Sequence, residues 1–233
     1  MKKSKNISQY LLGMKAGVPV MLGFIPVGIA YAIMARQGGF TVLQTCLMSL
    51  SVFAGASQMM AAGMYGQGAG MAAIILTTFI INLRHIIMSL CVAERMEKTS
   101  LPARMISAFG VTDESFAIFT TVKKENCTLW FFLGIITVTY SSWNLGTFIG
   151  AVFSDLLPAF LTAALGIALY AMFTALLVPG IKGNFKLILL VVLTALLNTL
   201  LSVFMDSGWA IILSTLVCAA IGVFFVDFKE EKS

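Results

Sequence analysis

The sequence is poor in charged residues, and this scarcity excludes a soluble globular protein. Asp, Glu, Lys and Arg make up 11% of its 233 residues, against about 25% in an ordinary soluble domain. So few charges cannot cover a folded surface in water. Hydrophobic residues make up 59% of the chain, its mean hydropathy is +0.97, and apolar runs extend along its whole length. The sequence therefore predicts an integral membrane protein with no room for a soluble catalytic domain.

Residues that build metal sites and disulfide frameworks are also scarce. The four cysteines show no zinc-type spacing, and His85 is the only histidine. No disulfide framework, metal site or cofactor is expected. No H-E-x-x-H or G-x-S-x-G motif occurs, so no enzyme activity is expected either. The net charge of +5 comes from lysines and arginines near segment ends, where they set orientation or contact lipid, and we expect no nucleic acid partner.

Apolar runs bounded by charges or turn residues predict up to eight membrane segments. We expect one domain over residues 1–233, with an all-α fold: a polytopic membrane helix bundle of six to eight segments. The predicted segments cover roughly 16–35, 41–63, 70–93, 105–122, 128–153, 158–178, 187–205 and 209–226.

Two of these segments are interrupted near their middle. Segment 41–63 contains the small-residue stretch Phe53–Gln58, and segment 105–122 contains Thr112–Ser115, with two adjacent carboxylates. Irregular backbone at membrane depth is tolerated only where protein or a water-filled cavity satisfies its polar groups, as in transporters with broken helices. We expect both segments to be broken or re-entrant.

The distribution of positive charge favours this interpretation. If all eight segments cross and the N-terminus is cytoplasmic, the basic stretch 94–104 lies outside, against the positive-inside tendency. If the two interrupted segments instead return to the side they entered from, that stretch moves inside and the tally becomes thirteen positive charges to one. We therefore predict six full spans, two broken or re-entrant segments and a cytoplasmic N-terminus in the cytoplasmic (inner) membrane.

Segment 70–93 carries ionisable residues where an apolar helix would have none. Helical spacing places Asn82, His85 and Ser89 on one face, with Arg84 one step round. An ionisable group in a span is costly and is usually functional. His85 could accept a proton near neutral pH. The structural alternatives are that Arg84 extends to the nearer interface and that His85 makes a single hydrogen bond.

Asp113 and Glu114 form a second polar cluster. One of them could pair with Arg84 while the other faces substrate or carries a proton, since burial favours the protonated form of a carboxyl group. The sequence does not distinguish the two. The structural alternative is that Thr112 caps a helix whose dipole the carboxylates stabilise.

The third polar feature is Ser57 and Gln58, beside the small residues of the first interruption. A helix that restarts inside the membrane exposes backbone N–H groups, which can hold a carboxylate. The alternative is close packing with Gln58 in an interhelical hydrogen bond. Trp143, Asn144, Gly146 and Gly150 form a small-residue face in segment 128–153, which we interpret as packing.

Taken in order, three stretches resemble the AzlC family of branched-chain amino acid permeases: Phe53–Gln58, Asn82–His85 and Thr112–Phe116. Trp143, Gly146 and Gly150 also fit the family pattern, and the resemblance covers essentially the whole chain. It implies secondary export of leucine, isoleucine, valine and analogues such as azaleucine. It also implies a partner, a separate small hydrophobic AzlD-type membrane subunit.

An exporter of this kind needs an anion site, a cation site and an apolar wall for a zwitterionic substrate. We expect the substrate-binding residues to be Ser57, Gln58, Asn82, Arg84 and Asp113, and the proton-coupling residues to be Glu114, Asp113 and His85. The competing hypotheses are a channel, which would have a continuous polar stripe, and an accessory membrane subunit for another small solute.

Overall fold

In the computed structural model, residues 2–156, 181–205 and 207–225 are described, together with Ile167, Thr174, Leu177 and Val178. The regular secondary structure of these residues is entirely helical, which confirms the all-α prediction. The chain forms two compact units, residues 1–169 and residues 170–233. A single domain over 1–233 stays a prediction.

The scaffold of the first unit is a pair of long helices, α1 (Lys2–Gln37) and α7 (Leu129–Phe153). They approach closely through glycines: a Cβ added to Gly28 would lie 2.8 Å from the Trp143 carbonyl oxygen, and one on Gly17 would lie 3.3 Å from that of Ile135. The residue later in α1 contacts the residue later in α7, so the two helices run parallel. Gly146 and Gly150 pack against α1 in the same way, which confirms the predicted packing face.

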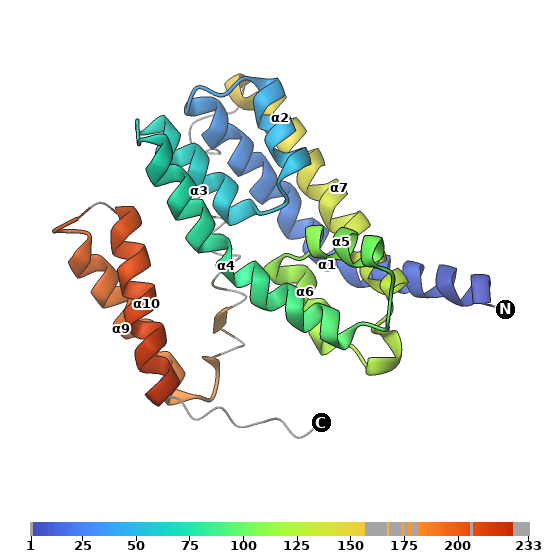
Figure 1. The fold of residues 1–233 in the computed structure, drawn as a ribbon. Coiled ribbons are helices and arrows are strands. Elements are labelled where there is room, and N and C mark those ends of the chain that lie inside the picture. Colours follow the sequence, from blue (N-terminus) through green and yellow to red (C-terminus); the bar gives the residue numbers. More distant parts are fainter. Residues whose placement is uncertain are drawn as a thin grey trace. The chain divides into compact units, whose positions relative to one another are not determined.

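The first interrupted segment is a helical hairpin made of α2 (Val42–Ser51) and α3 (Gly55–Gly66). The chain leaves α1, runs along α2 and turns. It then returns along α3, so that Gly66 packs against Gly38 near the end of α1. Nearby, the rings of Phe40 and Tyr65 lie 4.8 Å apart. Both ends of this segment therefore lie at the C-terminal end of α1, and the prediction of a broken or re-entrant segment is confirmed (Figure 1).

The second interrupted segment forms another hairpin, from the opposite end of the scaffold. Helix α4 (Met71–Arg95) is followed by α5 (Leu101–Phe109) and α6 (Asp113–Thr121). The Arg95 side chain donates a 2.7 Å hydrogen bond to the carbonyl oxygen of Val122, which follows α6. Helix α6 thus ends beside the end of α4, where the hairpin began, and this predicted interruption is also confirmed. A short 3-10 helix, η1 (Lys124–Asn126), leads on to α7.

The tips of the two hairpins meet at the middle of α7. Phe53, at the first tip, and Phe109, at the second, have ring centroids 6.4 Å apart. Both rings contact Tyr140 of α7, at centroid distances of 5.2 and 5.7 Å. Two helix interruptions from opposite ends of the unit therefore lie together near half the length of its scaffold.

Two of the described helices are long and apolar enough to cross a membrane: Lys5–Gln37, with a hydropathy of 2.0, and Met71–Arg95, with 1.8. Helix α7 has 25 residues, which gives it a length of about 37 Å, also enough to span a bilayer. Helix α1 begins at Lys2, well before the predicted start at residue 16, and the backbone of Tyr10, Gly13 and Met14 packs on α7.

In the second unit, α9 (Phe185–Leu201) and α10 (Ser207–Phe225) correspond to predicted segments 187–205 and 209–226. The Ser214 hydroxyl donates a 3.5 Å hydrogen bond to the Asn198 side chain, and Leu190 lies against Gly222. These pairs run in opposite directions, so the helices are antiparallel. Segment 158–178 lies outside the described residues, apart from the four single residues named above.

Candidate functional site

An ion pair joins the middle of α4 to the tip of the α5–α6 hairpin. The Nη1 of Arg84 lies 2.9 Å from the Oδ2 of Asp113, and the two side chains are 36% and 26% exposed. The expected pairing of Arg84 with one of the two carboxylates is therefore present. Which carboxylate pairs was open at the sequence level, and the structure places Asp113 in that position.

Glu114 occupies the next position of α6 and has a different environment. It is 7% exposed, and no ion pair links it to another residue in the described part of the chain. Thr112 caps α6 as the structural alternative proposed, accepting a 3.2 Å hydrogen bond from the backbone N–H of Ser115. In return, the Ser115 hydroxyl accepts a 2.8 Å bond from the backbone N–H of Thr112. The capping box fixes both carboxylates in the first helical turn.

Three buried polar atoms lie within one turn of α4 and have no hydrogen-bond partner among the described residues. They are Asn82 Oδ1, Arg84 Nε and His85 Nδ1. Leaving a buried polar group unpaired costs about 1–3 kcal/mol, so such groups are rare in folded proteins. Together the three offer both hydrogen-bond donors and acceptors. Their concentration indicates a place organised for a polar ligand.

The α2–α3 hairpin carries a different polar cluster, which we call the Gln58 network: Gln58, Ser49, Trp143 and Thr147. The Trp143 indole N–H donates to Gln58 Oε1 at 3.1 Å, and Gln58 Nε2 donates to the Ser49 hydroxyl, also at 3.1 Å. Ser49 and Thr147 share a 2.9 Å hydrogen bond. All four side chains are buried. Gln58 thus makes the interhelical hydrogen bonds that the sequence offered as its alternative role.

Trp143 has a role that the sequence analysis missed, since it was assigned to packing alone. A buried indole carries one N–H that needs an acceptor. That requirement was the available signal, because Gln58 is one of the few buried amides. The indole also supports the start of α3: a Cβ added to Gly55 would lie 2.7 Å from its ring.

Helix α3 begins at this hairpin tip without a side-chain cap. Its N-cap residue, Ala54, makes no capping hydrogen bond, and the Ser57 hydroxyl donates back to the Ala54 carbonyl oxygen at 2.9 Å. Helices α3 and α4 pack as a hairpin, and Ser57 precedes their connection by about as many residues as Asn82 follows it. The uncapped start of α3 therefore lies at the level of the polar turn of α4.

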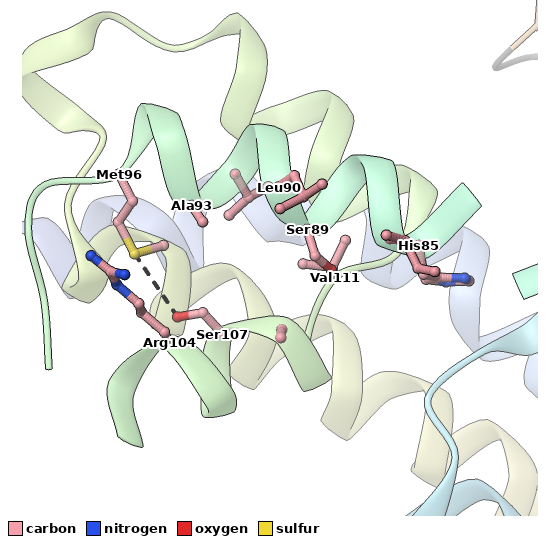
Figure 2. Close-up of a pocket in the computed structure, with 11 residues that line it drawn as sticks. His85, Ser89, Leu90, Ala93, Met96, Arg104, Ser107 and Val111 are labelled. Atoms are coloured by element: carbon pink, nitrogen blue, oxygen red, sulfur yellow. Dashed lines mark hydrogen bonds between the residues drawn. The ribbon is translucent and has the colours of Figure 1, made fainter. Parts of the chain in front are cut away.

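A groove of about 440 Å³ lies between α4 and α5. His85 stands at one end of it, and Met96, Arg104 and Ser107 stand at the other, with aliphatic side chains between (Figure 2). Ser107 contacts the Met96 sulfur at 3.9 Å. This groove was not predicted, because residues 94–104 were expected to form a loop. The available signal was one helical face with residues at positions i, i+3 and i+4, namely Arg104, Ser107 and Ala108.

Comparison with known proteins agrees with the resemblance to the AzlC family. The AzlC protein family matches residues 19–157. An uncharacterized membrane protein of Archaeoglobus fulgidus is 36% identical over 174 residues, which are 74% of this chain and 76% of the relative. The inner membrane protein YgaZ of Escherichia coli is 31% identical over 228 residues, 95% of this chain and 92% of the relative. The branched-chain amino acid transport protein AzlC of Bacillus subtilis is 29% identical over 164 residues, 69% of this chain and 63% of the relative. No solved structure is a significant match.

Proposed function

This chain belongs to the AzlC family of membrane transport proteins, and from that premise we propose that it exports branched-chain amino acids across the cytoplasmic membrane. The observation that carries the proposal is the polar centre at the meeting point of two broken helices. There the Arg84–Asp113 pair and three unpartnered polar atoms lie near half the length of α4. Substrate sites of secondary transporters are built at such broken helices near the bilayer midplane.

The polar centre offers complementary groups for a zwitterionic amino acid. We propose that the substrate carboxylate binds Arg84 Nε and the backbone N–H groups of the α3 start near Ser57. The ammonium group binds Asn82 Oδ1 and the carboxylate of Asp113. Gln58 belongs to the same proposed site as a positioning residue, because both ends of its amide are already hydrogen-bonded to Trp143 and Ser49. It fixes the start of α3 in the orientation that the carboxylate needs.

We propose Glu114 as the principal proton carrier, with Asp113 and His85 as its neighbours in the same relay. Glu114 is buried and makes no ion pair within the described residues, so a proton can neutralise it without breaking an ion pair. The two hairpins enter from opposite ends and meet at the site. Movement of one tip or the other would open the site to one side at a time, which is what alternating access requires.

The charges at the two ends of the first unit support a proposed orientation in the membrane. The end where α4 finishes and α7 begins carries Arg95, Lys98, Lys123 and Lys124, whereas Arg36 at the other end pairs with Asp155 at 3.7 Å. By the positive-inside rule, we assign the first end, and with it the N-terminus, to the cytoplasm. A small AzlD-type subunit is the proposed partner. Only 11% of the most apolar stretch of α4 is buried. The rest of this apolar stretch is available to contact such a subunit or lipid.

The test is leucine efflux from cells or vesicles loaded with radiolabelled leucine. The chain is expressed alone and with a small AzlD-type subunit, with and without a proton uncoupler. We expect uncoupler-sensitive efflux that requires both chains. The absence of leucine, isoleucine and valine flux in every combination would overturn the proposed function.

Neutralising the carboxylates tests the site itself. Asp113→Asn combined with Glu114→Gln should abolish efflux in protein that still inserts and assembles. Asp155→Asn is the matched control, because this carboxylate also pairs with an arginine but lies at the end of the scaffold. Retained efflux in the double variant would exclude these carboxylates as ligand and proton carrier.

A further inference from the structure

The groove between α4 and α5 connects the basic end of the first unit to the polar centre. Along α4 it extends from His85 to Met96, the residue after that helix, and along α5 from Arg104 to Val111, two residues past the end of that helix. Eleven residues of helix advance about 16 Å, which is longer than one amino acid. Its volume of about 440 Å³ lies within the range of small-molecule sites. The groove is therefore both long enough and wide enough to guide an amino acid toward Arg84 and Asp113.

The walls of the groove are chemically selective. Between its two ends the lining is almost entirely aliphatic, from residues such as Leu90, Val92 and Val111, and the described lining includes no Phe, Tyr or Trp. Small side chains, Ala93 on α4 and Ala108 on α5, leave the space open. Such a surface packs against a branched aliphatic side chain and gives no partner to a polar one.

The two ends of the groove are polar, and this favours an amino acid over a hydrocarbon chain. Arg104 at the outer end attracts a carboxylate. His85 at the inner end has its buried Nδ1 unpartnered among the described residues, and it follows directly after Arg84 in the ion pair. A lipid acyl chain would place its terminal methyl group against this polar turn and leave it unsatisfied.

From these contacts we propose that the groove is the entry pocket for the substrate on the basic side. In it the aliphatic side chain of the amino acid packs between α4 and α5 before its charged groups reach the polar centre. The pocket makes Ala93 and Ala108 specificity-determining residues, because they set its width. This proposal rests on the proposed function, which supplies the substrate class.

The experiment narrows and widens the pocket separately. Ala93→Leu and Ala108→Leu fill it, and Leu90→Ala widens it at a side chain that is 66% exposed, so the fold should tolerate the change. Ala72→Leu is the matched control, since Ala72 is an exposed alanine of α4 outside the groove. Uptake of labelled leucine by inverted vesicles is measured in competition with alanine, valine, leucine and phenylalanine, beside the binding of labelled leucine to the purified complex.

We expect the two filling variants to weaken the binding of leucine about tenfold more than that of alanine. This matches the discrimination that one or two methylene groups give in an apolar pocket. Leu90→Ala should gain competition by phenylalanine, a result that misfolding cannot produce. Ala72→Leu should match the unaltered chain. An unchanged order of substrates in the narrowed and widened variants would overturn the entry pocket and leave the proposed function intact, as would a lipid retained in the groove of a leucine-transporting complex. Absence of both leucine binding and flux in the unaltered complex would overturn the proposed function itself.

Discussion

Buried polar side chains lie beside both hairpin tips of the first unit, but their hydrogen-bonding groups are satisfied to different extents. At the α2–α3 tip, Gln58, Ser49, Trp143 and Thr147 hydrogen-bond to one another. At the polar turn of α4, facing the other tip, Asn82, Arg84 and His85 each keep a buried atom without a partner in the described part of the chain. A fully hydrogen-bonded network stabilises a fold, whereas unpaired donors and acceptors are tolerated where a ligand provides their partners. The comparison separates the region that holds the helices together from the region proposed to bind substrate.

The largest effect should come from Arg84→Gln, which removes the charge that pairs with Asp113. Loss of a charged hydrogen bond to both Asp113 and substrate should lower leucine efflux at least about 100-fold. The measurement is initial efflux at equal amounts of inserted protein. The exchanged pair, Arg84→Asp with Asp113→Arg, should restore assembly but not transport. Normal transport by the exchanged pair would mean that the ion pair is only structural.

Gly134→Ala should give the next largest effect, because α1 and α7 support both tips. An added Cβ would lie 2.7 Å from the Met14 backbone nitrogen. The helices would have to separate, at a cost of about 1–3 kcal/mol. We expect a lower Tm of the purified protein and damage to both regions. Gly23→Ala, in α1, is the control, since a Cβ added there would meet nothing within 4 Å, and it should leave Tm unchanged or raise it. An equal fall in Tm in both variants would contradict the close contact between Gly134 and α1.

Gln58→Leu tests the satisfied region. It leaves the buried indole N–H of Trp143 without its acceptor, which costs about 1–3 kcal/mol of stability. We expect a lower Tm, while efflux per folded molecule falls much less than in Arg84→Gln. Gln67→Leu, at an exposed amide just after α3, is the control and should leave Tm unchanged. A stable Gln58→Leu protein that fails to transport would instead place Gln58 in contact with substrate.

Asn82→Leu should have the smallest effect on stability, although it also removes a partly buried amide. The Asn82 oxygen has no partner among the described residues, so its removal breaks no hydrogen bond and should not lower stability. The KM for leucine should rise about tenfold, since the proposed ammonium contact is lost. A large fall in Tm with an unchanged KM would reverse the comparison between the two regions.

The interruptions of both segments could be predicted because their causes are local. Gly55, close before Ser57, weakens a helix, and Thr112 followed by two carboxylates is a helix start that can be recognised in sequence. The pairing of Arg84 with a neighbouring carboxylate follows from the cost of leaving it alone in an apolar helix. These features needed only a few adjacent residues.

The remaining features depend on contacts between distant parts of the chain. Trp143 and Gln58 are 85 positions apart, and nothing local to either residue specifies the other. Asp113 and Glu114 differ by about 100° around their helix, so the position of α6 against α4 decides which one reaches Arg84. The long start of α1 was missed because its first turns are polar, although Gly13 in this stretch packs on the backbone of Phe131.

The parallel arrangement of α1 and α7 imposes a rule of parity on the topology. Two parallel spans begin on the same side of the bilayer, so the chain between them must cross an odd number of times. With α4 as one crossing, the two hairpins must either both return or both traverse, and the structure has both returning. An insertion that turned one hairpin alone into a full span would invert α7 relative to α1 and separate every glycine contact between them. The two hairpins are therefore constrained to change together, although no hydrogen bond between them is needed to enforce it.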